Sequence, residues 1–156
     1  MYLAQLNIAT LVDDPDSPTV REFMVALEPI NRLGEVSPGF VWMLRDEEGD
    51  GAIGQRFPGH ETNDRLLVNL TVWSDFDSLT HFVRRSGHAT YVKRRREWFE
   101  RSQDPTTVLW WIDEGHTPTL AEAAERLEIL RTNGPTSRAF DLHTPFDDVG
   151  ESEVPG

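Results

Sequence analysis

Two histidines near the middle of the chain could carry acid–base chemistry. His81 and His88 lie seven residues apart in a segment predicted to be helical, interrupted by Ser86-Gly87. Imidazole titrates near neutral pH, so either side chain could serve as a general acid or base. Structural roles are the alternative, because His88 could cap a helix or fill the turn and His81 could sit satisfied at the edge of the core.

Arg95 is the third candidate catalytic residue. A helix predicted over residues 88–102 turns by about 100° per residue, which puts Arg95 on the same apolar arc as Tyr91 and Trp98. A guanidinium group among aromatic side chains must be paired or must bind an anion. An ion pair with a carboxylate and a clamp for a carboxylate or enolate ligand both remain open.

Strand asparagines and a large set of aromatic residues suggest a ligand pocket. Asn7 and Asn69 lie in apolar strand sequences, where an amide either is satisfied within the sheet or faces a cavity. The tryptophans serve the core, a dimer interface or the wall of a pocket for a planar apolar ligand. The residues expected to bind a substrate are Asn7, Asn69, Trp73, Tyr91, Trp98, Trp110 and Trp111.

Composition restricts the class of protein. The 156 residues include 27 acidic and 15 basic side chains and no cysteine, for a net charge of −12. Such a charge disfavours nucleic-acid binding, and the chain has neither an apolar run long enough to span a membrane nor a secretory signal. We therefore expect a cytoplasmic, single-domain protein. Seven basic residues concentrate between Arg84 and Arg101, but helical phase points them in several directions.

Apolar periodicity and capping signals predict the elements that position these residues. Thr119 and Glu122 form a capping box, and Pro29 should kink or shorten the first helix. Strands are expected over 2–11, 40–44, 66–73 and 107–112, with a short one within 138–146, and helices over 18–33, 75–85, 88–102 and 119–132.

This order predicts an α+β fold, a ferredoxin-like antiparallel sheet with helices on one face. The domain should cover residues 1–146, and residues 147–156 should form a disordered acidic tail. The open face of the sheet carries too many apolar residues for solvent. We therefore expect a homodimer that joins two sheets in a dimeric α/β barrel.

Several stretches together resemble one family of bacterial proteins, the domain of unknown function DUF3291. They include "SPGFVW", "LVNLTVW", "RRREWFE", "LWWIDEGHTPTLAEAAERL" and "NGPTSRAF", and the resemblance runs from Ala4 to about Phe146. The family is similar to the dimeric α/β-barrel superfamily, which includes antibiotic-biosynthesis monooxygenases. That resemblance implies cofactor-independent oxygenation of an aromatic or polyketide-like substrate, with a histidine as acid/base and Arg95 and Asn7 stabilising an enolate.

Two alternatives to oxygenation stay open for the same pocket. One is a non-redox cyclase or isomerase, and the other is a non-catalytic dimer that binds a small molecule or haem. Asn7 matches an asparagine of the haem-degrading relatives, but Phe82 stands where they have tryptophan. Their haem-ligating histidine falls near Tyr91 or Val92, so haem would need His81, His88 or Tyr91. We therefore expect no cofactor and no metal.

Overall fold

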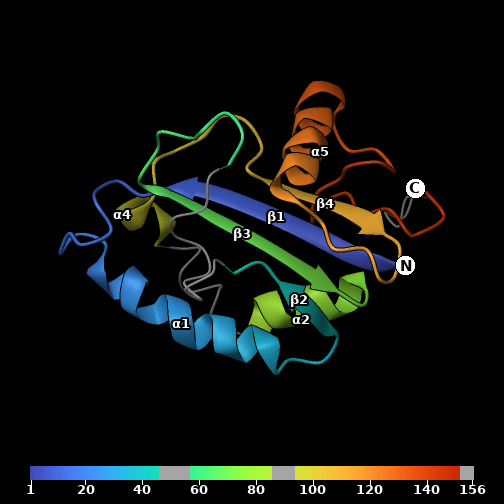
Figure 1. The fold of residues 1–156 in the computed structure, drawn as a ribbon, viewed down its shortest axis with the longest axis horizontal. Helices are drawn as coiled ribbons and strands as arrows, with labels where there is room; N and C mark the ends of the chain where they lie inside the picture. Colours follow the sequence, from blue (N-terminus) through green and yellow to red (C-terminus); the bar gives the residue numbers. More distant parts are fainter. Residues whose placement is uncertain (46–56, 86–93, 152–156) are drawn as a thin grey trace.

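The computed structural model describes residues 1–45, 57–85 and 94–151 (Figure 1). Four of the expected strands and three of the expected helices are present, and their ends lie within a few residues of the expected ones. The elements are β1 (Tyr2–Thr10), α1 (Arg21–Glu35), β2 (Phe40–Met43), β3 (Leu66–Trp73), α2 (Phe76–Arg85), α4 (Arg95–Trp98), β4 (Thr107–Ile112) and α5 (Leu120–Asn133).

The four strands form one antiparallel sheet in the order β2-β3-β1-β4. With α1 between β1 and β2 and α2 between β3 and β4, this is the split β-α-β arrangement of a ferredoxin-like fold. The expected α+β, ferredoxin-like fold is confirmed. The register sets Asn7 of β1 opposite Asn69 of β3 and Thr107 of β4. Three polar residues therefore lie in one row across the sheet.

Alternation along the strands gives the sheet two different faces. On one face Ala4, Leu6 and Val108 are fully buried and pack with Leu127 of α5. On the other face Leu3, Leu67 and Trp73 pack with residues of α1, α2 and α4. Figure 1 shows α5 on one side of the sheet and α1 and α2 on the other. The two expected helices of the ferredoxin-like unit share one face, and the additional helix covers part of the second.

The apolar face expected to be open is covered within a single chain. Its residues Ala4, Leu6 and Ile8 are at most 3% exposed because α5 and the segment around Phe57 pack over them. The reasoning that required a second sheet to cover this face is therefore wrong. Homodimerisation itself stays a prediction.

Three expectations about element ends differ from the structure. α1 begins later, at Arg21, and continues through Pro29 to Glu35, so the expected early end is wrong. The segment 138–146 forms isolated bridges, from Ala139 to Thr136 and from Phe140 to Leu109, instead of a strand. Residues 147–151 form a hydrogen-bonded turn in which the Asp147 carboxylate accepts from two backbone N–H groups.

The expected helix over 88–102 also ends early, and this changes where its cations lie. Residues 86–93 fall outside the described residues, and α4 covers Arg95–Trp98 only. Phe99 is extended, with φ −123° and ψ 144°, and the Glu100 N–H donates to the Thr10 carbonyl at 2.8 Å. Val12 N–H donates to the Trp98 carbonyl at 2.8 Å. The chain after α4 therefore runs beside the end of β1 and carries Arg101 with it.

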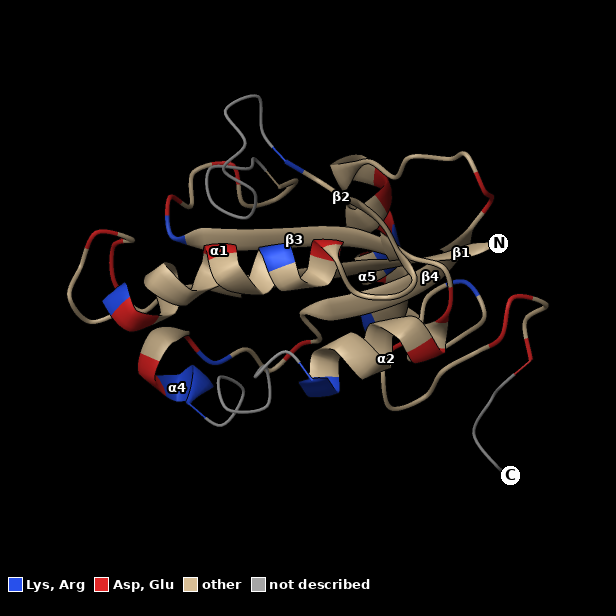
Figure 2. Cartoon of the chain, turned by 90° about the horizontal axis from the view of Figure 1, so that it is seen from below, with Lys and Arg blue, Asp and Glu red and all other residues tan. Residues whose placement is uncertain are grey.

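Arg94 joins α4 to α1. Its guanidinium donates two 2.6 Å hydrogen bonds to the Glu22 carboxylate and one of 2.7 Å to Glu97, and lies 4.7 Å from the centre of the Trp98 ring. Figure 2 shows these charges together where α4 meets the start of α1. Arg94 is therefore a paired, half-buried side chain and not a free surface cation. The hydrogen bonds from Arg94 lower the pKa of both carboxyl groups and raise that of the guanidinium.

Replacing Arg94 should weaken the pH dependence of the protein's stability in the acid range. Carboxyl groups with a depressed folded-state pKa contribute stability above their unfolded pKa, near 4.5, and lose it as pH falls through the folded value. Arg94→Met should lower the melting temperature by a few degrees at pH 7, and the difference from wild type should shrink below about pH 4.5. Thermal unfolding followed by circular dichroism across this range measures it. Arg21→Met, at the exposed start of α1, is the control, and an Arg94→Met deficit that is constant with pH would contradict the ion-pair role.

The cap of α5 gives a second stability test. Thr119 Oγ1 accepts from the Glu122 N–H at 3.1 Å, as the capping box predicts. The Glu122 carboxylate accepts instead from Trp110 Nε1 at 2.8 Å and contacts His116 Nε2 at 2.6 Å. Thr119→Ala should lower the free energy of unfolding by about 1 kcal/mol. Thr132→Ala, in the last turn of the same helix, should change it little, and equal urea midpoints for the two variants would exclude the cap.

Candidate functional site

A cavity of about 410 Å³ lies between α1 and the sheet. Gln5, Asn7 and Ala9 are only half-buried although α1 crosses their face, whereas Ala4 and Leu6 on the opposite face are sealed. The cavity is therefore on the side of the sheet that α1, α2 and α4 share. This is the location that the sequence predicts for a ligand pocket.

The cavity has an apolar wall and a polar floor. Phe23, Leu27 and Ile30 of α1 form the wall, and Asn7 and Asn69 lie on the sheet opposite them. A planar apolar molecule would pack against the α1 side chains, and its oxygen atoms would face the amides. Further lining residues are Thr107 of β4, His60 and Asn31 at the sides, and Arg95, Arg101 and Arg131.

Asn7 is held in place by its neighbour on β4. Thr107 Oγ1 donates to Asn7 Oδ1 at 3.0 Å, which leaves the Asn7 NH₂ group as a donor. Within the described residues, no protein acceptor contacts that NH₂ group or the side-chain amide of Asn69. A polar floor with amide donors can bind a carbonyl or enolate oxygen. The structure brings these two asparagines together on the floor of the cavity, and their role in binding stays a proposal.

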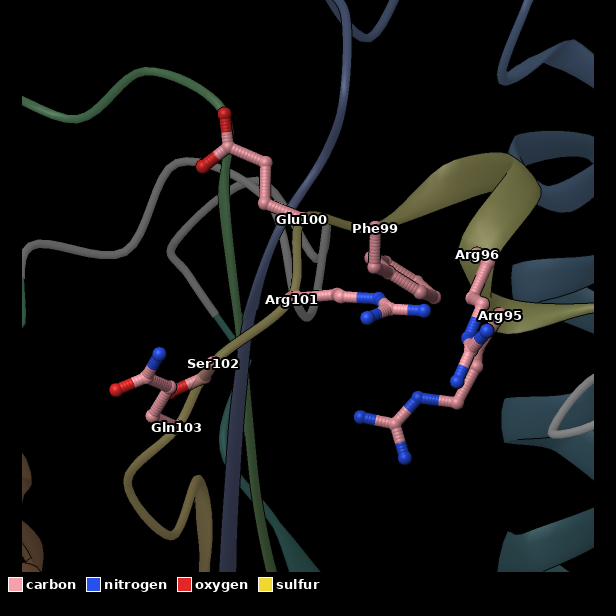
Figure 3. Close-up of a pocket in the computed structure, with 7 residues that line it drawn as sticks. All are labelled: Arg95, Arg96, Phe99, Glu100, Arg101, Ser102 and Gln103. Atoms are coloured by element: carbon pink, nitrogen blue, oxygen red, sulfur yellow. The ribbon is translucent and has the colours of Figure 1, made fainter.

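A second cavity of about 460 Å³ adjoins the first at α4. Arg95, Arg96 and Arg101 lie around it, and Figure 3 shows their guanidinium groups extending toward a common space. The two cavities have five lining residues in common, namely Arg95, Phe99, Glu100, Arg101 and Ser102. The two spaces therefore meet at the segment that follows α4.

Arg95 does not have the environment that helical phase predicts. The expectation of a desolvated guanidinium among Tyr91 and Trp98 is wrong, since Arg95 is exposed, Trp98 is buried and Tyr91 lies outside the described residues. Arg95 nevertheless lines both cavities. No carboxylate of the described residues lies within ion-pair distance of it, although Arg94, one position earlier, has two.

Among the described residues, the histidine that lines a cavity is not one of those that the sequence predicts. His81 is exposed on α2 and is not a lining residue of either cavity, and His88 lies outside the described residues. His60 does line the cavity between α1 and the sheet. Sequence reasoning missed it because it lies in a Gly- and Asp-rich stretch without periodicity. Its one local signal is Phe57, three residues earlier, which is buried and whose ring centre lies 5.9 Å from that of the imidazole in a tilted arrangement.

The tryptophans belong to the core and not to the cavity walls. Trp73, Trp98 and Trp110 are at most 1% exposed, and neither they nor the half-buried Trp111 lines the two cavities. Their observed role is packing in the core, and their contact with substrate stays a prediction. Trp110 and Trp111 lie on opposite faces of β4, as alternation along a strand requires, and they belong to different core clusters.

Trp73 also fixes polar groups on the cavity side of the sheet. Its Nε1 donates to Thr71 Oγ1 at 3.0 Å, and that hydroxyl donates to Gln5 Oε1 at 2.9 Å. This chain of hydrogen bonds satisfies the buried Thr71 hydroxyl. It also orients Gln5, one row along the sheet from Asn7. Trp73 therefore holds the polar row next to that of Asn7 from within the core.

Residues 1–45, 57–85 and 94–151 lack two further kinds of feature. These residues contain no group of three or more histidine, aspartate or glutamate side chains that could hold a metal ion. None of their helices is both long and apolar enough to cross a membrane.

Two solved structures are similar to this chain, both of SnoaB, a cofactor-independent oxygenase from Streptomyces nogalater. The first is 18% identical, covers 72% of this chain and 94% of its own, and superimposes with a TM-score of 0.46. The second, a mutant of the same enzyme, is 18% identical, covers 76% and 98%, and has a TM-score of 0.44. Similarity at this level says nothing about the reaction of this chain. No curated protein matches it.

The family resemblance read from the sequence motifs is confirmed by a match along nearly the whole chain. The family model described as domain of unknown function, DUF3291, matches residues 2–154. The matched region includes β1, β3 and α1, which build the cavity, and α4, which adjoins it. The protein therefore belongs to the DUF3291 family.

Proposed function

We propose that the cavity between α1 and the sheet binds a small aromatic or polyketide-like molecule and that the protein oxygenates it without a cofactor. The observation that carries the proposal is the pairing of Asn7 and Asn69 at the polar floor, opposite the apolar side chains of α1. The apolar body of the molecule would pack on Phe23 and Leu27. Its carbonyl oxygen would accept hydrogen bonds from the amides.

Such a site favours the ionised form of an enolisable substrate. When a base removes a proton from a carbon that is next to the carbonyl group or conjugated with it, negative charge develops on the carbonyl oxygen. Amide donors held in place before the reaction stabilise that charge, and a nearby guanidinium adds to the effect. Asn7, Asn69 and Arg95 have these roles in the proposal. The base is His88, one of the two histidines that the sequence predicts, or His60, which lines the cavity.

An electron-rich enolate can react with oxygen by itself. The substrate carbanion transfers an electron to O₂, and the two radicals combine to a hydroperoxide on carbon. Loss of water then leaves a new carbonyl group, so that a CH₂ group and one O₂ give a ketone and one H₂O. The protein supplies proton transfer, charge stabilisation and exclusion of bulk water. Neither haem nor a metal ion enters this sequence.

A non-redox cyclase or isomerase is the second candidate. The same enolate would attack a carbon atom of the substrate or be protonated elsewhere, and Asn7 and Asn69 would have the same role. The two reactions differ in whether oxygen is consumed.

Anthrone, a planar ketone with an acidic CH₂ group, is a suitable probe for oxygenation. The protein without added cofactor should accelerate its conversion to anthraquinone, with one O₂ consumed per molecule in an oxygen electrode. A chelator should leave the rate unchanged. Turnover of a related substrate under argon would favour the cyclase, and anthrone that binds without turnover would contradict the oxygenation.

The Asn7 amide can be tested with a matched pair of variants. Asn7→Ala should lower kcat for anthrone by about a hundredfold, the loss typical of removing one oxyanion donor. Asn133→Ala makes the same change at the end of α5, away from both cavities, and should keep full activity. Thermal unfolding checks that both variants fold. Full activity in Asn7→Ala would remove this residue from the site.

A further inference from the structure

Three arginines at the second cavity have no carboxylate partner among residues 1–45, 57–85 and 94–151. They are Arg95 and Arg96 of α4 and Arg101 of the extended segment, and all three side chains are exposed. Figure 3 shows the three guanidinium groups extending toward the same space while Glu100 points away from it. In a chain with 27 acidic residues, such a cluster of cations is unexpected.

The nearest carboxylates in the sequence are occupied elsewhere. Glu97 accepts from Arg94 at 2.7 Å, and Glu100 pairs with Arg65 at 3.4 Å. The backbone explains this separation, because the chain becomes extended at Phe99 and Glu100 pairs with β1. Arg101 projects from the other side of this extended segment, so it lies toward α4 while Glu100 points away. The fold thus separates three cations from the carboxylates that could neutralise them.

The number of donors indicates the kind of anion that fits. Elsewhere in this protein a single arginine, Arg94, supplies both hydrogen bonds to the Glu22 carboxylate, at 2.6 Å each. Three guanidinium groups around one space therefore exceed what one carboxylate needs. A phosphoryl group has three acceptor oxygens and up to two negative charges, and arginine binds it bidentately.

We propose that Arg95, Arg96 and Arg101 form a subsite for a phosphoryl group carried by the substrate. The two cavities meet at Arg95, Phe99 and Arg101, so one molecule can reach from the asparagines to the arginines. This part of the inference rests on the proposed function. The substrate would then be a phosphate ester whose apolar end lies under α1 and whose charged end lies at α4.

Phenyl phosphate is the probe for the subsite, measured by isothermal titration calorimetry at low salt. Wild type should bind it, and Arg96→Gln and Arg101→Gln should each weaken binding about tenfold, because each removes a charge-assisted hydrogen bond. Arg138→Gln makes the same charge change in the exposed segment after α5 and should bind as wild type does. No binding by wild type, or equal affinities in all four proteins, would overturn the proposal.

The pH dependence and the comparison anions test the phosphoryl chemistry. Phenyl phosphate loses its second proton near pH 6, so its affinity should rise between about pH 5 and 7.5. Benzoate is already ionised there and should bind weakly and without that rise. Tighter binding of benzoate would contradict the phosphoryl assignment. Inorganic phosphate that binds as tightly as phenyl phosphate would mean that the site takes free phosphate, which overturns the substrate assignment.

The subsite and the oxygenation can fail separately. Anthrone carries no phosphoryl group, so its turnover does not require the subsite, and Arg138→Gln, at a residue that lines neither cavity, should leave that turnover unchanged. Asn7→Ala should conversely leave phenyl phosphate affinity within about twofold of wild type. Phosphate binding without anthrone turnover would reject the proposed reaction alone. Anthrone turnover without phosphate binding would reject the subsite alone.

Discussion

The pairing of β1 with β3 and β4 is the constraint on which the candidate site depends. One register brings Asn7 next to Asn69 and Thr107, and strand alternation puts all three on the face under α1. A slip by one residue would turn these polar groups into the sealed apolar face under α5. Burial of Ala4, Leu6 and Ile8 on that face therefore also fixes the amides on the cavity side.

The arginines between Arg94 and Arg101 differ in role because the backbone changes direction after α4. Arg94 has a structural role, since it pairs with Glu22 and Glu97 and packs on Trp98. One residue later, Arg95 lies at the cavities without such a partner in the described part of the chain. The extended backbone from Phe99 then separates Glu100 from Arg101. Neighbouring cations of one sequence run thus have structural and candidate binding roles.

The sequence predicted the sheet and the cavity better than it predicted the cations. Strand alternation is local, so the faces of Asn7, Trp110 and Trp111 could be read from residue parity. The environments of Arg94 and Arg95 depend on where a helix ends, and no local signal marks the change at Phe99. The cover over the apolar face depends on long-range packing of α5. His60 was missed because its place at the cavity arises from the fold of an aperiodic segment.

A crystal structure of the protein with anthrone bound tests the central claim most directly. The account predicts the ring system against Phe23 and Leu27, with the carbonyl oxygen within hydrogen-bond distance of the Asn7 or Asn69 amide. Anthrone at another site, or in this cavity with its oxygen turned away from both asparagines, would contradict it.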